Sequence, residues 1–327
     1  MASSTAQPGS VVAVTRAVPA GPIVVPGATV RHGPAHALPR EEVLRFVAGS
    51  AVVVSMFSDR IDDEFLDAAG PGLRGICHYA VGMDAVDLEA CRQRGVIVTS
   101  TPDAVTEGTA NMAIGLMLAV ARRILEGDRF VRSGGWARAA PLGMADMLGP
   151  ALAGRTLLIV GAGRIGTAVA LRARAFGMDV LYASRSRSEA IERSLIAAER
   201  IDMDAGLARA DVVSLHTPLT PDTRHLLDRQ RIGLLPVGAI VINTSRGPVI
   251  DEAALVEALS DGRLWGAGLD VLEHEPDPAP GLLDHPRVVL TPHIGSGEDR
   301  WRGETTRMCE RAAADILAGR EPAHRVA

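Results

Sequence analysis

The chain contains no lysine, so all 34 of its basic residues are arginine. Together with 39 acidic residues they give a formal net charge of −5. A protein without an excess of positive charge cannot readily displace counterions from a phosphate backbone. The sequence therefore argues against a nucleic-acid partner, and we treat the missing lysine as a bias of composition.

The sequence also lacks the segments that direct a chain to or across a membrane. Its first residues, MASSTAQPGS, offer neither the basic region nor the following apolar region of a signal peptide. No window approaches the roughly 18 uninterrupted apolar residues of a membrane span. We expect a cytoplasmic protein without a membrane partner.

Cysteine is scarce, and the three that occur are widely spaced: Cys77, Cys91 and Cys309. An odd number at these spacings forms neither a disulfide framework nor a cluster of metal ligands. The nine histidines show no helical pair with metal-binding spacing. We expect reduced, partly buried thiols and no metal.

The length of 327 residues suits two domains. Short apolar runs bounded by turns alternate with longer helix-like stretches, which is typical of α/β proteins whose parallel sheets are covered on both faces. We expect a first sheet of four strands and a second of six. The expected strands are Val11–Val14, Ala51–Ser55, Gly75–His78, Val96–Val98, Leu157–Val160, Val180–Ala183, Asp211–Leu215, Ala239–Asn243, Gly266–Val271 and Val288–Thr291.

One expected helix, Glu107–Leu125, is apolar on nearly every side until Arg122 and Arg123. A helix without a polar face must be buried all round, so we expect it between domains or, preferably, between subunits. The segment 132–150 after it is rich in Gly, Pro and Ala and predicts an extended excursion over a neighbour. A last helix is expected at about 298–317.

A glycine-rich turn follows the expected strand Leu157–Val160. It reads Gly161-Ala162-Gly163-Arg164-Ile165-Gly166 and opens a helical stretch. In this context the first glycine makes a tight turn, the second lets the backbone approach a pyrophosphate, and the third lets the helix pack on the strand. The free N–H groups and partial positive charge at the start of a helix favour phosphate. The turn predicts a dinucleotide-binding domain.

The next expected strand ends in Ser184-Arg185-Ser186-Arg187. About twenty residues after the glycines, NAD-binding folds place an acidic residue that binds the ribose hydroxyls. Here a serine takes that place and two arginines are close by. Guanidinium groups and hydroxyls would bind a 2′-phosphate that a carboxylate would repel. The segment favours NADPH over NADH, and a solvated arginine loop without a ligand is the alternative.

Polar side chains come just after the later strands. They are His216-Thr217-Pro218, Thr244-Ser245-Arg246, Asp270, Glu275 and His293. The carboxyl ends of parallel strands meet at one edge of a sheet, so we expect these residues near one another. Reduction of a 2-keto acid needs a proton donor such as histidine, a carboxylate that orients it and favours its protonated form, and an arginine for the substrate carboxylate. The hydride would come from the nicotinamide.

At these segments the chain resembles the D-isomer-specific 2-hydroxyacid dehydrogenases, and most of all their glyoxylate/hydroxypyruvate reductase branch. The motifs that carry the resemblance are GAGRIG at 161–166, HTPLTPDTR at 216–224, NTSRGPVID at 243–251, GAGLDVLEHEP at 266–276 and TPHIGS at 291–296. The resemblance covers nearly the whole chain.

The resemblance implies roles for single residues. Arg246 would be the substrate arginine, Glu275 the carboxylate partner and His293 the acid/base, which would also contact substrate. The backbone N–H groups of Val81 and Gly82 would hold the substrate carboxylate. The cofactor-binding residues would be Gly161, Gly163, Arg164, Ile165, Gly166, Ser184, Arg185, Ser186, Arg187, His216, Thr217, Pro218, Thr223, Thr244, Ser245, Asp270 (toward the nicotinamide amide), His293 and Gly295.

The resemblance also implies a domain layout. Residues 1–105 and 298–327 would form a smaller flavodoxin-like α/β substrate domain. A Rossmann-type, doubly wound domain, residues 106–297, would be inserted in it and would carry the dimerisation helix. The family implies a homodimer, with Trp136 a candidate to reach the partner's active site. Ala85 stands where many members carry asparagine, which leaves the detailed shape of the substrate loop open.

The sequence thus predicts a homodimeric, NADPH-dependent reductase of small 2-keto acids, glyoxylate or hydroxypyruvate by preference, that yields D-2-hydroxy acids. D-lactate, D-phosphoglycerate and specialised substrates remain open. Formate dehydrogenases share the architecture but pair the histidine with glutamine, so Glu275 argues against that activity. The alternative from another class is a non-catalytic dinucleotide-sensing protein, like the corepressors of this fold, whose long disordered extensions this chain lacks.

Overall fold

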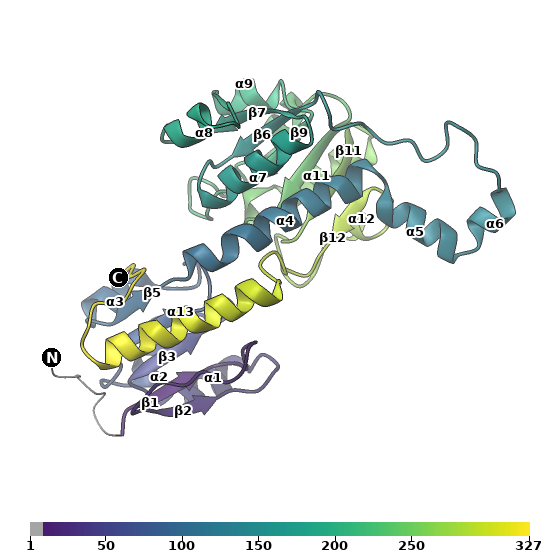
Figure 1. The fold of residues 1–327 in the computed structure, drawn as a ribbon. Helices are drawn as coiled ribbons and strands as arrows, with labels where there is room; N and C mark the ends of the chain where they lie inside the picture. The colour runs from purple at the N-terminus through teal and green to yellow at the C-terminus, as the bar shows by residue number, and fades with distance from the viewer. Residues whose placement is uncertain (1–8) are drawn as a thin grey trace. The chain divides into compact units, whose positions relative to one another are not determined.

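The computed structural model describes residues 9–327, which divide into two compact units. One unit comprises the chain up to Val105 together with Ser296–Ala327, and the other comprises Thr106–Gly295. Each contains one sheet whose strand pairs are all parallel in the described residues. The predicted α/β class is confirmed (Figure 1).

The first unit holds a five-stranded sheet in the order β2-β1-β3-β4-β5. Helices α1 to α3 share an apolar cluster with one face of the sheet, and α13 shares another with the opposite face. Figure 1 shows α13 beside β3, and α13 contacts both β3 and β4. The elements are β1 (Val11–Val14), β2 (Thr29–His32), α1 (Arg40–Val47), β3 (Val52–Ser55), α2 (Asp63–Ala69), β4 (Gly75–His78), α3 (Leu88–Gln93), β5 (Ile97–Thr99) and α13 (Asp299–Leu317).

The second unit holds a seven-stranded sheet in the order β12-β11-β10-β9-β6-β7-β8. The chain enters at β6, runs outward to β8, and then returns to β9 to build the other half. Its elements are α4 (Pro102–Ala121, which begins in the first unit), α5 (Ile124–Arg132), α6 (Gly135–Ala139), β6 (Thr156–Val160), α7 (Arg164–Ala175), β7 (Asp179–Ala183), α8 (Glu189–Arg193), β8 (Glu199–Arg200), α9 (Met203–Leu207), β9 (Val212–Leu215), α10 (Arg229–Leu234), β10 (Ala239–Asn243), η1 (Gly247–Val249), α11 (Glu252–Ser260), β11 (Leu264–Leu269), α12 (Pro280–Leu283) and β12 (Val288–Leu290).

Alternation along β6 explains why this sheet is covered on both faces. Leu157 and Ile159 point to one face and join the buried cluster with α4 and α7. Leu158 and Val160 point to the other face, where they meet side chains from α9, α10 and α11. Because successive side chains in a strand point to opposite faces, a strand that is apolar throughout needs helices on both sides. The reversal between β6 and β9 is the point where ligands bind in open α/β sheets.

Two strands were not predicted, and both lie at sheet edges. β2 has the sequence TVRH and no buried residue, and β8 is only two residues long. A strand without a buried face carries no apolar run. The expectation of four and six strands is therefore corrected to five and seven.

The long apolar helix also differs from expectation. α4 begins at Pro102 rather than Glu107 and ends at Ala121, because Arg123 adopts a left-handed φ of 53° that interrupts the helix before α5. Its buried positions include Ala113 and Met117, whereas Asn111 is exposed, so its own unit does not bury it all round.

Helix α4 is long and apolar enough to cross a membrane, with a mean hydropathy of 1.3, by length and composition only. However, 61 % of that window is buried within the chain, as in the core helix of a folded domain. All three cysteines are buried and unpaired. No group of three or more potential metal-ligating side chains occurs within residues 9–327.

Candidate active site

The ends of three neighbouring strands bring distant segments together. Asn243 at the end of β10 lies beside Leu269 of β11, which lies beside Leu290 of β12. The residues that follow these strands, Thr244, Asp270 and Thr291, therefore leave the sheet side by side. This confirms that the polar segments after the later strands share one edge of the sheet.

His293 and Glu275 form a direct pair at this edge. His293 Nδ1 lies 2.9 Å from Glu275 Oε2. An ionised carboxylate can only accept, so Nδ1 carries the hydrogen and donates it. The other ring nitrogen, Nε2, is then the atom with which His293 can give or take a proton. The His293 side chain is 26 % exposed, so its ring is supported by the protein and still reachable.

The Glu275 carboxyl is held in its charged form. Burial alone would raise its pKa, but the hydrogen bond from His293, the positive charges of His293 and Arg246, and the N–H of Leu272 together lower the pKa below its usual value. Glu275 is therefore a carboxylate at neutral pH.

Asp270 holds the loop that carries His293. The carboxylate is almost fully buried, and it accepts hydrogen bonds from Thr291 Oγ1 at 2.6 Å, Ile294 N at 2.9 Å and Gly295 N at 2.7 Å. His293 N donates to the carbonyl oxygen of Asp270 at 2.8 Å. His293 has a left-handed φ of 54°, an uncommon conformation that needs such fixed surroundings. A contact between Asp270 and the nicotinamide amide stays a prediction.

Asn243, which the sequence analysis passed over, shapes the loop of Arg246. Its side-chain amide donates to the carbonyl oxygen of Arg246 at 2.9 Å and accepts from Ser245 N and Ser245 Oγ. The side chain is buried at the end of β10. A single polar residue in an otherwise apolar strand is the feature of the sequence that could have indicated this role. Asn243 thereby fixes the backbone on which the Arg246 guanidinium is mounted.

Gly247 joins the Arg246 loop to the Glu275 loop. A Cβ at this position would lie 1.8 Å from the carbonyl oxygen of Leu272 and 2.4 Å from the backbone nitrogen of Glu273. Only a residue without a side chain permits this approach of the two backbones. Arg246 directly precedes Gly247, and Glu275 lies three residues after Leu272. The close approach of the two backbones therefore holds both side chains in one constellation.

The glycine-rich turn has the geometry that a pyrophosphate needs. Gly161 has a φ of 97°, and a Cβ there would lie 2.7 Å from the carbonyl oxygen of His216. A Cβ on Gly166 would lie 2.1 Å from the carbonyl oxygen of Gly161, so α7 packs closely on the turn. At Gly163 the space around a Cβ is open. The turn thus leaves room next to the exposed N-terminus of α7.

A cavity of about 980 Å³ extends from this turn over the ends of β7 and β9. Buried polar atoms at this end of the sheet have no hydrogen-bond partner among the described residues: His216 Nδ1, Thr217 Oγ1 and Thr244 Oγ1. Burial lowers the pKa of His216 to about 3, so its ring is neutral. Unpartnered polar atoms, an open glycine turn and this volume fit a dinucleotide. Residues lining the cavity include Gly161, Gly163, Ser184, Arg185, Ser186, Arg187, His216, Thr217, Pro218 and Thr223.

Arg187, one of the two arginines expected at a 2′-phosphate, has a carboxylate partner in the structure, and its role toward the cofactor stays a prediction. Arg187 lines the cavity, but its Nε donates to Glu192 Oε2 at 2.7 Å, so a carboxylate from α8 already binds the guanidinium that was expected to bind a 2′-phosphate. Arg185 is exposed beside Ser184, as the expectation requires. Arg200, which the sequence analysis did not single out, lines the same cavity.

The remaining predicted residues lie at the start of α7, after β9 and in the first unit. Arg164 and Ile165 begin α7, and the hydroxyl of Thr223 closes a turn by donating to the carbonyl oxygen of Pro218 at 2.6 Å. Val81 and Gly82 lie in the first unit, in the turn after β4, where Val81 is exposed. Their role toward a substrate carboxylate stays a prediction.

Comparison with known proteins gives a consistent family. Residues 114–295 match the family described as D-isomer specific 2-hydroxyacid dehydrogenase, NAD binding domain. A glyoxylate reductase of Thermococcus litoralis is 44 % identical over 86 % of this chain and 83 % of that protein. A crystal structure of a protein from Thermus thermophilus is 42 % identical, with a TM-score of 0.89 over 97 % of this chain and all of that one.

A second solved structure contains a bound cofactor. It is an NADPH-dependent glyoxylate/hydroxypyruvate reductase from Sinorhizobium meliloti, in complex with NADP and malonate. It is 28 % identical to this chain, with a TM-score of 0.82 over 97 % of both chains.

Proposed function

This chain belongs to the D-isomer-specific 2-hydroxyacid dehydrogenases, and we propose that it is a cytoplasmic, NADPH-dependent reductase of small 2-keto acids, with glyoxylate and hydroxypyruvate as preferred substrates. The observation that carries the proposal is the pair of His293 Nδ1 and Glu275 Oε2 at 2.9 Å, with the Arg246 charge near enough to lower the pKa of Glu275. A proton donor, its carboxylate and an arginine are the groups that keto-acid reduction requires.

In the proposed reaction a nicotinamide, when bound, supplies the hydride to the carbonyl carbon. His293 Nε2 gives its proton to the carbonyl oxygen, which becomes the hydroxyl of the product. The Nδ1–H bond to Glu275 holds the ring in one orientation while Nε2 loses the proton. Arg246 binds the substrate carboxylate through its fork of donors, which a point charge cannot reproduce.

The proposed preference for NADPH is supported by the residues after β7. Ser184 stands where NAD-binding folds place an acidic residue, so there is no carboxylate at that position to receive ribose hydroxyls or to repel a 2′-phosphate. One charge-assisted hydrogen bond to the phosphate contributes enough for a preference of about tenfold or more. NADP in the S. meliloti reductase shows that a relative of this fold accepts the phosphorylated cofactor.

Steady-state assays of cofactor oxidation with a panel of keto acids test the proposal. We expect glyoxylate and hydroxypyruvate to be reduced better than pyruvate, and phenylpyruvate or branched keto acids to be reduced poorly. With glyoxylate, kcat/KM for NADPH should exceed that for NADH by at least about tenfold. A preference for phenylpyruvate would refute the substrate class, equal use of both cofactors would refute the NADPH preference, and no oxidation at all would favour a dinucleotide-sensing protein.

Glu275→Gln should shift the alkaline limb of the pH profile for reduction to lower pH. Reduction needs protonated His293, and the neutral amide no longer stabilises the imidazolium, so the proton is lost at lower pH than in the wild type. The measurement is kcat/KM for glyoxylate across pH. Asp277→Asn, which removes an exposed carboxylate two residues along the same loop, is the matched control and should leave the limb in place. An alkaline limb that stays or rises in Glu275→Gln would show that the pairing has no part in the protonation.

We also propose a homodimer built through α5, α6 and the segment up to Pro150. Figure 1 shows this segment projecting from the rest of the second unit. It exposes apolar side chains that a partner would cover: Ile124, Val131, Trp136, Met144 and Leu148 are each more than half exposed. Large apolar side chains gathered on one projecting segment are typical of a subunit interface.

A further inference from the structure

Three of the arginines that line the cavity lie near Ser184, and they differ in whether a carboxylate pairs with them. Arg187 and Arg200 line both the large cavity and a smaller adjoining one of about 420 Å³, while Arg185 lines the large cavity. Whether each can bind an anion depends on the carboxylates near it.

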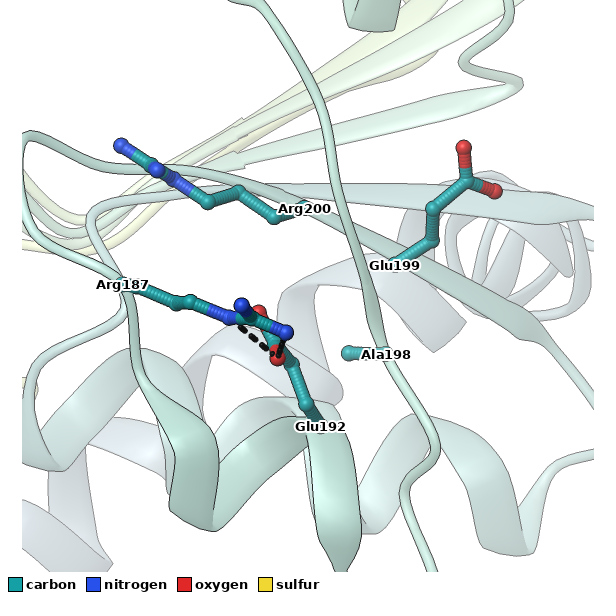
Figure 2. Close-up of a pocket in the computed structure, with 5 residues that line it drawn as sticks. All are labelled: Arg187, Glu192, Ala198, Glu199 and Arg200. Carbon is teal, nitrogen blue, oxygen red and sulfur yellow. Dashed lines mark hydrogen bonds and ion pairs between the residues drawn. The ribbon is translucent and has the colours of Figure 1, made fainter.

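Arg187 is neutralised by Glu192. Its Nε and Nη2 both lie 2.7 Å from Glu192 Oε2, as Figure 2 shows. The Glu192 side chain is only 14 % exposed and also accepts a hydrogen bond from Tyr182 Oη, which in turn accepts from Ser188 N at 3.0 Å. The hydrogen bonds from Arg187 and Tyr182 lower the pKa of Glu192. The pair carries no net charge, and it braces α8 against β7.

Arg200 is held in a different way. It lies on the edge strand β8, beside Tyr182 of β7, and its Nη2 donates to the carbonyl oxygens of Ser184 and Arg185 at 3.1 Å each. Figure 2 shows its side chain extending away from Glu192 and from Glu199. Glu199 pairs instead with Arg209 at 3.2 Å. Across residues 9–327, Arg200 forms no ion pair, and its Nε and Nη1 have no hydrogen-bond acceptor.

Two arginines thus lie beside Ser184, Arg185 and Arg200, and neither forms an ion pair within the part of the chain described, although the Arg200 charge acts on Glu192 without a direct contact. Arg185 is exposed and, like Arg200, forms no ion pair there. Two carboxylates also line the cavity. Asp202 is engaged by the N–H groups of Asp204 and Ala205 at the start of α9, and Asp222 lies on the separate loop that follows β9. The positive charge beside Ser184 remains open to an anion.

We propose that Arg200 is a further specificity-determining residue, which together with Arg185 binds the 2′-phosphate of NADPH. In this proposal Arg187 has a structural role, because its guanidinium is paired with Glu192. A phosphate has three oxygens that accept hydrogen bonds from more than one guanidinium at once. Arg200 is already oriented by two carbonyl oxygens, so little side-chain freedom is lost when it binds. The inference rests on the proposed function, because it presupposes that the cofactor carries this phosphate.

Calorimetric titration with two fragments of the cofactor tests the inference without turnover. Adenosine 2′,5′-bisphosphate and adenosine 5′-monophosphate differ only in the 2′-phosphate. The wild type should bind the bisphosphate at least about tenfold more tightly. Arg200→Ala should reduce that ratio by about tenfold while affinity for the monophosphate changes less than about twofold. If the loop loosens in this variant, affinity for the monophosphate falls too, and Arg200→Gln, which retains an N–H donor for the two carbonyls, then provides the test.

Two control variants separate the arginines. Arg229→Ala removes an exposed arginine of the same unit whose partner, Glu257, lines neither cavity, and it should leave the ratio unchanged, which excludes a general effect of charge. Arg187→Gln combined with Glu192→Gln removes both charges of the pair without leaving a bare carboxylate beside the site, and should also leave the ratio within about twofold.

The outcomes distinguish the inference from the proposed function. If the wild type does not discriminate between the two fragments, the NADPH preference itself is wrong. If it discriminates, but the ratio survives in the Arg200 variants and is lost in the doubly neutral Arg187 and Glu192 variant, then Arg187 binds the phosphate. In that case the inference is overturned while the proposed function stands.

Discussion

His293→Asn is expected to lower kcat/KM for glyoxylate reduction by about 10²–10⁴-fold, the usual cost of losing a positioned general acid. Asparagine has no group that titrates near neutral pH, so it cannot pass a proton to the carbonyl oxygen. It is also the replacement that fits the backbone best, because His293 has a φ of 54° and asparagine tolerates this left-handed region. The loss should therefore come from the chemistry and not from the loop.

Binding of NADPH, followed by calorimetry, is the control for His293→Asn. The cavity that we assign to the dinucleotide is lined by the glycine-rich turn and by the ends of β7 and β9, which the substitution does not touch. Cofactor affinity should change by less than about threefold. A folded His293→Asn enzyme with near-wild-type turnover would remove His293 from the mechanism.

Gly247→Ala should be almost as damaging, although it adds only one methyl group. The new Cβ would lie 1.8 Å from the carbonyl oxygen of Leu272, and both contacting groups are backbone, so the two loops must separate. A displacement of the order of 1 Å at a reacting constellation costs about 10²-fold in rate. We expect a loss of kcat/KM of about that size, together with a destabilisation of about 1–3 kcal/mol from overpacking.

Gly233→Ala is the matched control for Gly247→Ala. Gly233 lies in α10 of the same unit, and a Cβ there meets no atom within 4 Å. Alanine is favoured over glycine in a helix, so this variant should retain activity and equal or exceed the wild type in thermal stability. If Gly247→Ala retained wild-type kcat/KM, the close approach of the two loops would not be what sets the geometry of Arg246 and Glu275.

Buried strands that are bounded by turn residues can be predicted from the sequence to the exact residue. Strands β1, β4 and β10 begin and end at the expected residues, because each is buried and bounded by turn residues. The place of His293 and Glu275 at the edge of the sheet also follows from the rule that parallel strands gather their carboxyl ends, whereas their pairing was implied by the family resemblance. Both depend on local patterns that repeat from element to element.

Sequence patterns do not reveal the features that a tertiary contact decides. Arg187 and Arg200 are both arginines near the glycine fingerprint, and nothing in their local sequence tells that Glu192 would bind the first and that two backbone carbonyls would bind the second. β8 is an exposed edge strand of two residues, so no apolar run marks Arg200 as part of the sheet. Asn243 was missed because it acts through three hydrogen bonds to the loop that carries Arg246, and the course of that loop is known only from the structure.

The division of the first unit between two ends of the chain has a consequence for synthesis on the ribosome. The face of its sheet formed by Val12, Val52 and Val54 is completed by Cys309, Ile316 and other side chains of α13. Between Val105 and α13 roughly 190 residues must be translated, which takes about 10–40 s at ordinary elongation rates. During that time the second unit emerges whole, while strands β1 to β5 have an uncovered apolar face. The first unit can complete this cluster only after α13 has been made, so the two units are completed in the reverse of the order in which they begin.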